Sequence, residues 1–262
     1  MRAYIAVFTL RFRALLQYRA AAVAGMGTQF FWGLIRMMIF LAFYEHASAD
    51  EPLDAGQVVA YVWLGQAFFL LIPFRTDSEL EQLVRTGNVA YELLRPVDLL
   101  GIWYWRAIAS RLAPTLLRSI PLLVVSTLTG WIHWGPVSSI LAGIAALAGA
   151  VLLSSSVSTV MAITLFWTIS GKGINNFLAT LSMFFSGLII PLPLFPDAAQ
   201  PVLNLLPFRG FGDVPYRLFM GHLPPDRLPM LLLHQILWVF LLLLFSRFLL
   251  GRAMKRLVIQ GG

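Results

Sequence analysis

The chain has 262 residues, of which 59% are hydrophobic and only 12% are charged, and its net charge is +7. A soluble domain carries roughly a quarter charged residues, and several apolar runs here are long enough to cross a hydrocarbon core of about 30 Å. Composition therefore predicts an integral membrane protein, with a soluble protein of very apolar core helices as the alternative. Cysteine is absent, which excludes disulfides and thiolate metal sites.

Residues 1–19 place Tyr4, Phe8, Phe12 and Leu15 at helical spacing among several arginines. This pattern predicts a helix that lies in the cytoplasmic membrane interface. The alternative is that these residues simply begin a long first span. No small-residue cleavage site follows a short apolar core, so we expect mature sequence and not a removable signal.

Six apolar stretches follow as candidate membrane-spanning helices. They cover residues 20–44, 58–74, 102–128, 137–167, 176–191 and 230–250. No repeat period or low-complexity tract separates them into units. We therefore expect an all-α membrane protein with a single transmembrane domain over residues 1–262.

Lysine and arginine are concentrated in some connections and absent from others. They lie in the N-terminal segment, in residues 75–100, in a Ser-Gly-Lys-Gly turn at Lys172 and in the tail Arg-Ala-Met-Lys-Arg, whereas residues 45–56 and 130–136 have none. Cytoplasmic loops are the ones enriched in these residues. The distribution predicts cytoplasmic N- and C-termini, an even number of spans and a cytoplasmic position for residues 75–100.

Residues 75–100 interrupt the apolar sequence with the charged block RTDSELEQLVRTGNVAYELLRPVDLL. An apolar stripe that includes Leu80 has helical spacing, and Gly87 can end that helix. Pro96 then disfavours helical geometry at Arg95. The pattern predicts a short amphipathic helix, a bend and a second short element. The stripe must pack against a partner protein or against interfacial lipid, and a loop helix without any partner is the alternative.

Residues 192–229 are rich in proline, which forbids one long helix there. Residues 198–206 are apolar enough for a short helix that dips into the outer leaflet. Irregular backbone at that depth is tolerated only where protein buries it or where it lines a cavity. We expect a re-entrant segment that forms an outer lid over a pathway, with an ordinary surface loop as the alternative. The prolines assigned to this lid are Pro191, Pro193, Pro196 and Pro207.

Among the arginines in the predicted spans, Arg106 is expected to snorkel from the cytoplasmic interface, which leaves Arg36, Arg111 and Arg118 to be explained. A charge at the bilayer centre is costly, so such residues usually face a bundle interior, pair or snorkel. The predicted spans contain no acid to neutralise them, which leaves backbone carbonyls, cavity water, an anionic substrate or a lipid headgroup as partners. We expect Arg111 or Arg118 to face a polar cavity and assign all three to a possible translocation pathway. Deeper snorkelling with a misplaced span boundary is the alternative.

Two stretches are motif-like: GNVAYELLRPV after the second span and FFSGLIIPLPLFPDAAQPVLNLLPF around the end of the fifth. The first contains the pattern formed by Gly87, Leu93, Leu94, Arg95, Pro96 and Val97. With these motifs and its layout, the chain resembles the permease subunits of ABC-2-type transporters, in the branch with Leu-Leu-Arg-Pro-Val after the second span. The resemblance covers the whole chain in layout, and in motif only these two stretches.

The resemblance implies that residues 75–100 act as a coupling helix seated in a groove of a separate ATPase subunit. Its interface residues would be Glu79, Glu81, Arg85, Gly87, Leu93, Leu94, Arg95 and Pro96. It further implies two ATPase copies that bind ATP and Mg²⁺, and a second permease, identical or similar, in a bacterial inner membrane. By the habit of the family, the substrate would be hydrophobic, amphipathic or cationic, and the direction would be export.

The chain itself has no P-loop, because Gly171-Lys172 lacks the upstream glycine and position 166 is Phe. The histidines lack ligand spacing and no catalytic carboxylate pair or Ser/His/Asp set is visible, so we expect no metal, no cofactor and no enzymatic activity in this chain. We also expect no nucleic-acid partner. The alternatives are an ion-coupled transporter, which needs an intramembrane acid that the predicted spans lack, and a non-transporting membrane assembly protein.

Overall fold

The computed structural model of the chain describes residues 1–46, 51–168 and 171–255. Within these residues the secondary structure is helical, without strands. Four helical segments there are long and apolar enough to cross a membrane: Arg19–Tyr44 (α2), Leu99–Leu128 (α6), Val137–Thr164 (α7) and Pro225–Met254, which contains α11 (Leu228–Met254). The chain is therefore an all-α membrane protein. Ser170 of the predicted turn and Arg256 of the predicted basic tail lie outside the described residues.

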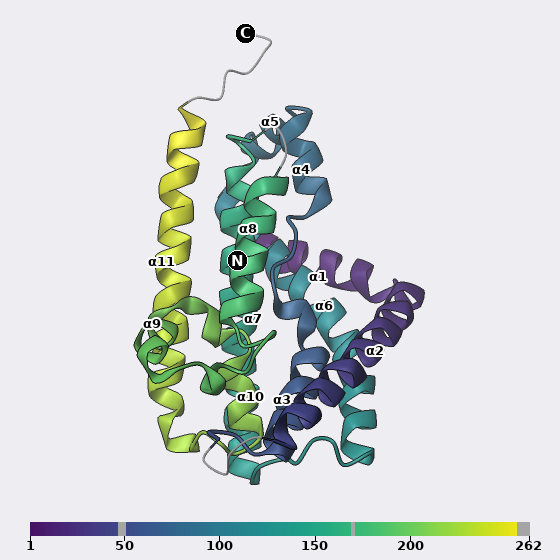
Figure 1. Cartoon of the computed structure of the whole chain (residues 1–262). Coiled ribbons are helices and arrows are strands. Elements are labelled where there is room, and N and C mark those ends of the chain that lie inside the picture. Colours follow the sequence, from purple (N-terminus) through teal and green to yellow (C-terminus); the bar gives the residue numbers. More distant parts are fainter. Residues whose placement is uncertain (47–50, 169–170, 256–262) are drawn as a thin grey trace.

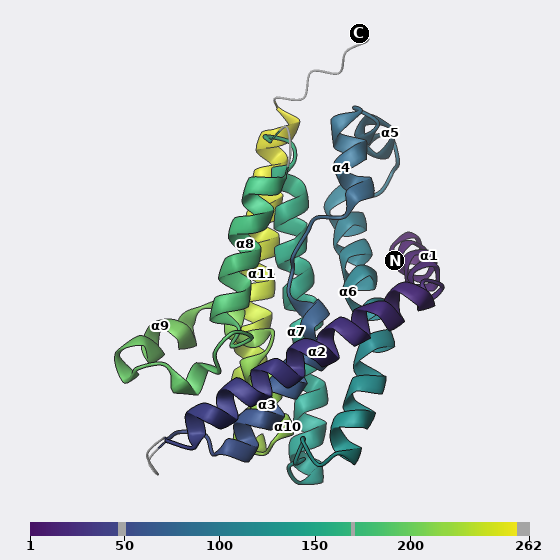
Figure 2. The ribbon, with the colours of Figure 1, turned by 45° about the vertical axis from the view of Figure 1, so that its right-hand side comes forward.

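Helix α1 (Arg2–Leu16) is separate from α2, because the chain leaves helical geometry at Tyr18 before α2 begins. Figure 2 shows α1 lying across the outside of α6, at an angle to the bundle. Tyr4 packs where α6 has Gly101, since a Cβ at that glycine would come within 2.8 Å of the tyrosine ring. Residues 1–19 thus do not simply begin a long first span.

The second predicted span is only half helical. Helix α3 (Ala55–Ala67) begins with a capping box, in which Asp54 Oδ1 accepts from the Gln57 amide at 2.8 Å, and nearly all of it is buried. It stops at Ala67 and is followed by a short 3₁₀ helix, η1 (Phe69–Leu71), and then by extended chain. Pro73 disfavours helical geometry at Ile72. The predicted span over residues 58–74 is therefore a short helix continued by non-helical backbone.

The fifth predicted span is also interrupted. Helix α8 (Lys172–Phe185) begins earlier and ends earlier than the predicted 176–191, and Gly187 then takes a φ of +86°, which glycine adopts without strain. The amide of Asp213, at the start of α10 (Asp213–Phe219), donates to the Ser186 carbonyl at 3.0 Å. The end of α8 thus meets the start of α10, and these two short helices follow one another through the bundle.

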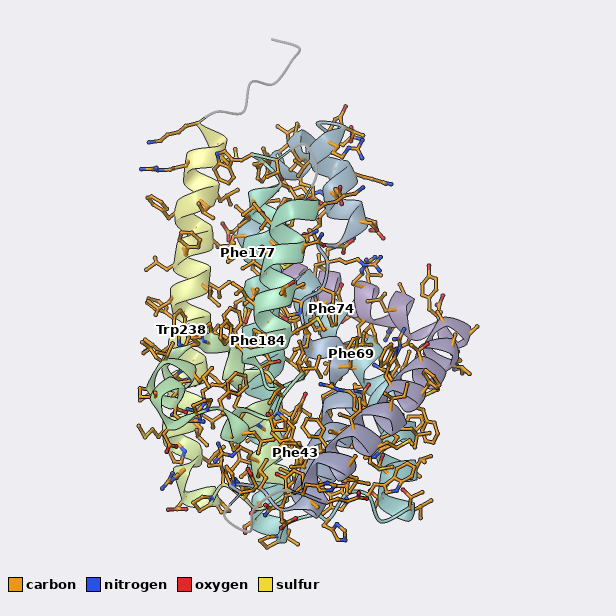
Figure 3. All side chains as sticks on the ribbon, viewed as in Figure 1. Phe43, Phe69, Phe74, Phe177, Phe184 and Trp238 are labelled. Carbon is orange, nitrogen blue, oxygen red and sulfur yellow. The ribbon has the colours of Figure 1, made fainter. Side chains whose placement is uncertain are left out.

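Residues 192–229 form a series of short helices, as their prolines predict. They are η2 (Leu192–Leu194), η3 (Asp197–Ala199), α9 (Gln200–Leu205), η4 (Pro207–Gly210), α10 and η5 (Pro225–Arg227). Pro191, Pro193, Pro196 and Pro207 lie at or next to the starts of three of them. Helix α9 lies on the flank of the bundle, where Trp238 of α11 donates to the Leu205 carbonyl at 2.9 Å (Figure 3). Helix α10 is instead buried against α7 and α3.

Helix α7 lies at the centre of the packing and contacts α6, α10 and α11. Small residues permit this closeness: Gly149 lies against Gln235 of α11, whose Nε2 donates to the Ala146 and Gly210 carbonyls at 3.0 and 2.9 Å. Helix α6 runs without interruption through Pro114 and Pro121.

Figure 1 shows α4 (Ser78–Arg85) and α5 (Val89–Leu93) at the same end of the molecule as the C-terminal end of α11. Helices α3 and α10 lie at the opposite end. The extended chain after η1 runs along the bundle and joins the two ends. It brings α4 alongside the first turns of α6, where Asp77 and Glu79 pair with Arg106.

Candidate functional site

Residues 75–100 form the helix, bend and second element that the sequence predicts. Asp77 caps α4, with its Oδ1 accepting from the Glu79 amide at 3.0 Å. Gly87, at a φ of +75°, ends α4 in the left-handed conformation that favours glycine. Helix α5 follows, and Asp98 caps α6 by accepting from the Gly101 amide at 2.9 Å. Two acidic caps and one glycine thus fix the shape of the segment.

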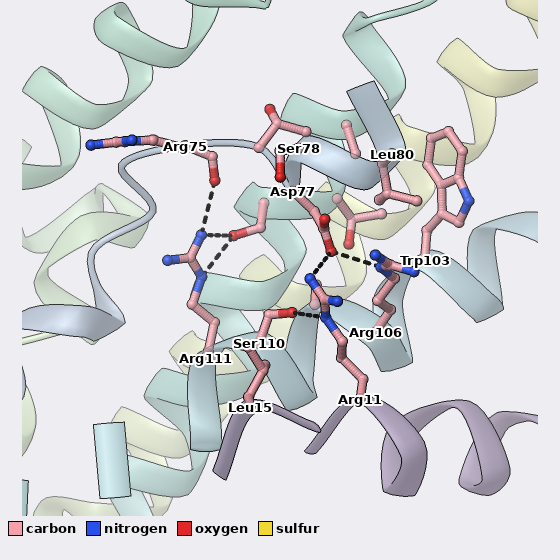
Figure 4. A pocket seen from close by; sticks show the side chains of 15 residues that line it. Arg11, Leu15, Arg75, Asp77, Ser78, Leu80, Trp103, Arg106, Ser110 and Arg111 are labelled. Carbon is pink, nitrogen blue, oxygen red and sulfur yellow. Dashed lines mark hydrogen bonds and ion pairs between the residues drawn. The ribbon is translucent and has the colours of Figure 1, made fainter. Parts of the chain in front are cut away.

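Ion pairs attach α4 to the rest of the bundle (Figure 4). Asp77 Oδ2 accepts from Arg106 Nε of α6 at 2.7 Å and from Arg11 Nη2 of α1 at 3.0 Å. Glu79 accepts from Arg11 Nη1 at 2.6 Å and also from Arg106. The hydrogen bonds from Arg106 and then Arg11 lower the pKa of Glu79 below its ordinary value of 4.5. Two carboxylates on α4 are therefore held by two arginines from two other helices.

Arg111 holds the extended chain between η1 and α4. Its Nη1 donates to the Ile72 and Leu70 carbonyls at 3.2 and 3.4 Å, and its Nη2 donates to the Arg75 carbonyl at 3.4 Å. Nε and Nη2 also donate to Ser158 Oγ at 3.1 and 2.8 Å. Backbone carbonyls and a hydroxyl thus surround the guanidinium, one of the partner sets left open by the sequence. A cavity of about 250 Å³ lies beside it and extends to Arg106.

The serine-rich turn of α7 supports the same extended chain. Ser154 donates to the Leu71 carbonyl, next to the two carbonyls that Arg111 holds. Side chains of neighbouring helices thereby donate to carbonyls that have no partner within a helix. This explains why the second span can leave helical geometry inside the bundle.

The predicted interface residues of the segment divide into two groups. Arg85, Gly87, Leu94, Arg95 and Pro96 are exposed, whereas Glu81 and Leu93 are half-buried. Glu79 is turned toward Arg11 and Arg106 and so serves contacts within the chain. Leu94 is 81% exposed, and the neighbouring Tyr91, which sequence reasoning did not single out, is 70% exposed. The far end of the segment therefore presents apolar side chains to its surroundings.

Of the three predicted pathway arginines, the structure brings Arg36 and Arg118 together and leaves Arg111 apart. Arg36 and Arg118 line one groove of about 580 Å³ between α2, α3, α6 and the end of α8. Arg36 Nη2 donates to the Ile189 carbonyl at 2.5 Å, and Arg118 Nη2 donates to the Ala21 carbonyl at 3.3 Å. The remaining lining is largely apolar, with Gln29 and Gln66 as its buried amides.

An acid outside the predicted spans also lies inside the packed region, in the proline-rich segment 192–229. Asp213, 1% exposed, accepts from the Tyr61 hydroxyl at 3.2 Å and from Arg217 Nη1 at 3.4 Å. Composition alone does not single out Asp213 within the proline-rich segment. The sequence Gly212-Asp213 followed by Pro215 has the form of a helix start, and this signal could have located α10.

Comparison with known proteins gives one result on the family. Residues 30–261 match the family described as ABC-2 family transporter protein. No curated protein matches the chain. The family is the membrane component of a transporter, not itself catalytic, and it implies association with an ABC ATPase in general. Because the match covers far more than half of the sequence, the chain belongs to the ABC-2 family of transporter membrane proteins.

Proposed function

We propose that the chain is the permease subunit of an ATP-driven ABC exporter in a bacterial inner membrane. Two permease subunits, identical or similar, would form the pathway, and two ATPase subunits that bind ATP and Mg²⁺ would sit beneath them. One observation carries the coupling part of this proposal. Helices α4 and α5 lie at the same end of the molecule as the C-terminal end of α11 and expose Leu94 and Tyr91, and ion pairs tie α4 to α1 and α6.

This arrangement supports a route for mechanical coupling. An ATPase that pushes on α4 and α5 would act on Asp77 and Glu79, and through them on Arg106 of α6 and Arg11 of α1. The extended chain held by Arg111 would transmit the same movement toward η1 and α3. Because the ion pairs hold α4 to two helices, a movement of α4 would move α1 and α6 as well.

Six crossings with both termini cytoplasmic follow from the same proposal. The four long helices would account for four crossings. The other two crossings would be α3 with its extended continuation, which is the second in chain order, and α8 followed by α10, which is the fifth. Interrupted spans are compatible with a membrane protein where the non-helical backbone is buried in protein, and here Arg111 and Ser154 satisfy it.

The groove of Arg36 and Arg118 is the proposed part of the translocation pathway, for a hydrophobic or amphipathic substrate as in multidrug efflux. Ile189, whose carbonyl binds Arg36, comes directly before the proline-rich segment 192–229. A movement of that segment would therefore change the groove, which is how we propose that its exposed part serves as an outer lid. The buried α10 would remain within the bundle.

The test is purification of the tagged chain from its native membrane, followed by identification of bound subunits and ATPase measurement. We expect a stoichiometric ATPase whose retention falls in Arg85→Glu, because this exposed charge lies on α4. Arg13→Glu on exposed α1 is the matched control and should retain the partner. A wild-type chain that purifies without any ATPase contradicts the proposal.

A further inference from the structure

The groove described above has a regular construction on its α2 side. Gly25, Gln29, Trp32 and Arg36 follow one another at spacings of three and four residues, so they share one face of the helix. The opposite wall comes from η1, α6 and the end of α8. A volume of about 580 Å³ lies within the range of about 300–1,000 Å³ typical of small-molecule sites.

The charge in this groove has one sign. Arg36 and Arg118 line it, and none of its lining residues is an acid. In the part of the chain that the structure describes, neither arginine forms an ion pair, and each donates to a single backbone carbonyl. A guanidinium in apolar surroundings is stabilised by an anion far better than by one neutral acceptor.

Unpartnered polar atoms mark one end of the groove. Gln29 is 5% exposed, and neither its Oε1 nor its Nε2 has a hydrogen-bond partner among the residues described. The same holds for Nε of Arg118. The Arg118 guanidinium lies directly over Gly25, one helical turn from Gln29. Buried polar groups almost always have a partner, so this end is built to receive one.

We propose that the groove binds an amphipathic anion, with its carboxylate or phosphate head at Arg118 and Gln29. Its apolar body lies along Trp32 and Phe69 toward Arg36. This inference deepens the proposed function, because it makes the exported compound, or a lipid held in its pathway, an anion and not a cation. The binding itself needs no ATPase, so it can be tested apart from transport.

The experiment uses the purified full chain in nanodiscs of neutral phosphatidylcholine. Two fluorescent probes are titrated: a dansyl-labelled C11 carboxylate and the matched dansyl-labelled C11 trimethylammonium. We expect the carboxylate to bind roughly tenfold more tightly or better, the scale of one charge-assisted hydrogen bond. Arg118→Gln should remove this preference, and Gln29→Leu should weaken carboxylate binding while leaving trimethylammonium binding unchanged. Arg13→Gln, an exposed arginine on α1, should leave both unchanged.

Two further arms identify the source of the anion. If a lipid is the natural occupant, anionic phosphatidylglycerol in the nanodisc will displace the carboxylate probe. If an exported compound is the occupant, phosphatidylglycerol will leave the probe bound, and proteoliposomes with the ATPase will transport it. Equal binding of the two probes to the wild-type chain overturns the inference, as does an unchanged preference in both groove variants. Loss of transport with retained carboxylate binding would count against the exporter proposal alone.

Discussion

Asp77, the cap of helix α4, lies 2.7 Å from Nε of Arg106 in helix α6. The same carboxylate also accepts from the Glu79 amide and from Arg11. One side chain thus starts helix α4 and fixes it to the bundle. This double use explains how a helix of only eight residues keeps a defined position against α1 and α6.

Asp77→Asn should separate these two uses. Asparagine can still cap α4, but it removes the charge that Arg106 and Arg11 share, and we expect a loss of about 1–3 kcal/mol for this partly buried network. Asp77→Ala should cost about 1 kcal/mol more, because the cap is lost as well. SDS titration of the purified variants measures both. An Asp77→Asn variant as stable as the wild-type chain would show that the ion pairs contribute nothing, and equal losses in the two variants would show that the cap contributes nothing.

Arg111→Gln should destabilise the chain by about 2–4 kcal/mol, because each buried acceptor left without a donor costs about 1–3 kcal/mol. The carbonyls of Leu70, Ile72 and Arg75 lose their shared donor in this variant. Ser158→Ala removes the hydroxyl that accepts from Arg111 but leaves the three carbonyls with their donor, so it is the matched control, with an expected loss below about 1.5 kcal/mol. The same titration compares the two, and a smaller loss in Arg111→Gln than in the control would contradict this role.

Much of the helical layout could be predicted from the sequence, because the length of an apolar run is a local signal. Helices α2, α6, α7 and α11 lie close to their predicted ranges, and Gly87 ends α4 as expected. Hydropathy alone could not show where α3 and α8 would stop. Their ends depend on contacts with distant residues, above all Arg111 on the carbonyls after η1 and the meeting of Ser186 with Asp213.

The candidate site was harder to predict for the same reason. Residues of the segment 75–100 are neighbours in sequence, so its motif could be recognised directly. The groove instead joins Arg36 and Arg118 from helices α2 and α6, and spacing along one helix carries no information about such a pairing. Arg111 and Arg118 are seven residues apart on α6, yet Arg111 donates to the chain after η1 and Arg118 donates to α2.

The ion pairs of α4 should weaken in acid. Glu79 has a lowered pKa, so its contribution to stability is complete above the ordinary value of 4.5 and is lost as pH falls through the lower folded-state value. The midpoint temperature of thermal unfolding should therefore fall more steeply between neutral pH and pH 3 for the wild-type chain than for Glu79→Gln. Glu81→Gln on the same helix is the control and should keep the steep slope. Parallel curves for the wild-type chain and Glu79→Gln would contradict this contribution.

Single cysteines can test the proposed orientation, because the chain contains no cysteine of its own. Arg85→Cys lies on α4, and His133→Cys lies in the connection between α6 and α7. In intact cells with the outer barrier permeabilised, a membrane-impermeant maleimide should label His133→Cys and spare Arg85→Cys. Labelling of Arg85→Cys alone would invert the proposed topology.

The most direct test of ATPase docking at α4 and α5 compares two leucines of nearly equal exposure, one shortly before α6 begins and one at its last residue. Leu94 at the tip after α5 is 81% exposed, and Leu128 at the far end of α6 is 82% exposed. Co-purification of the ATPase with Leu94→Asp and Leu128→Asp separates contact at the tip from a general effect of an added charge. We predict that Leu94→Asp loses the ATPase and that Leu128→Asp keeps it. Retention of the ATPase by both variants would contradict the assignment of α4 and α5 as its docking segment.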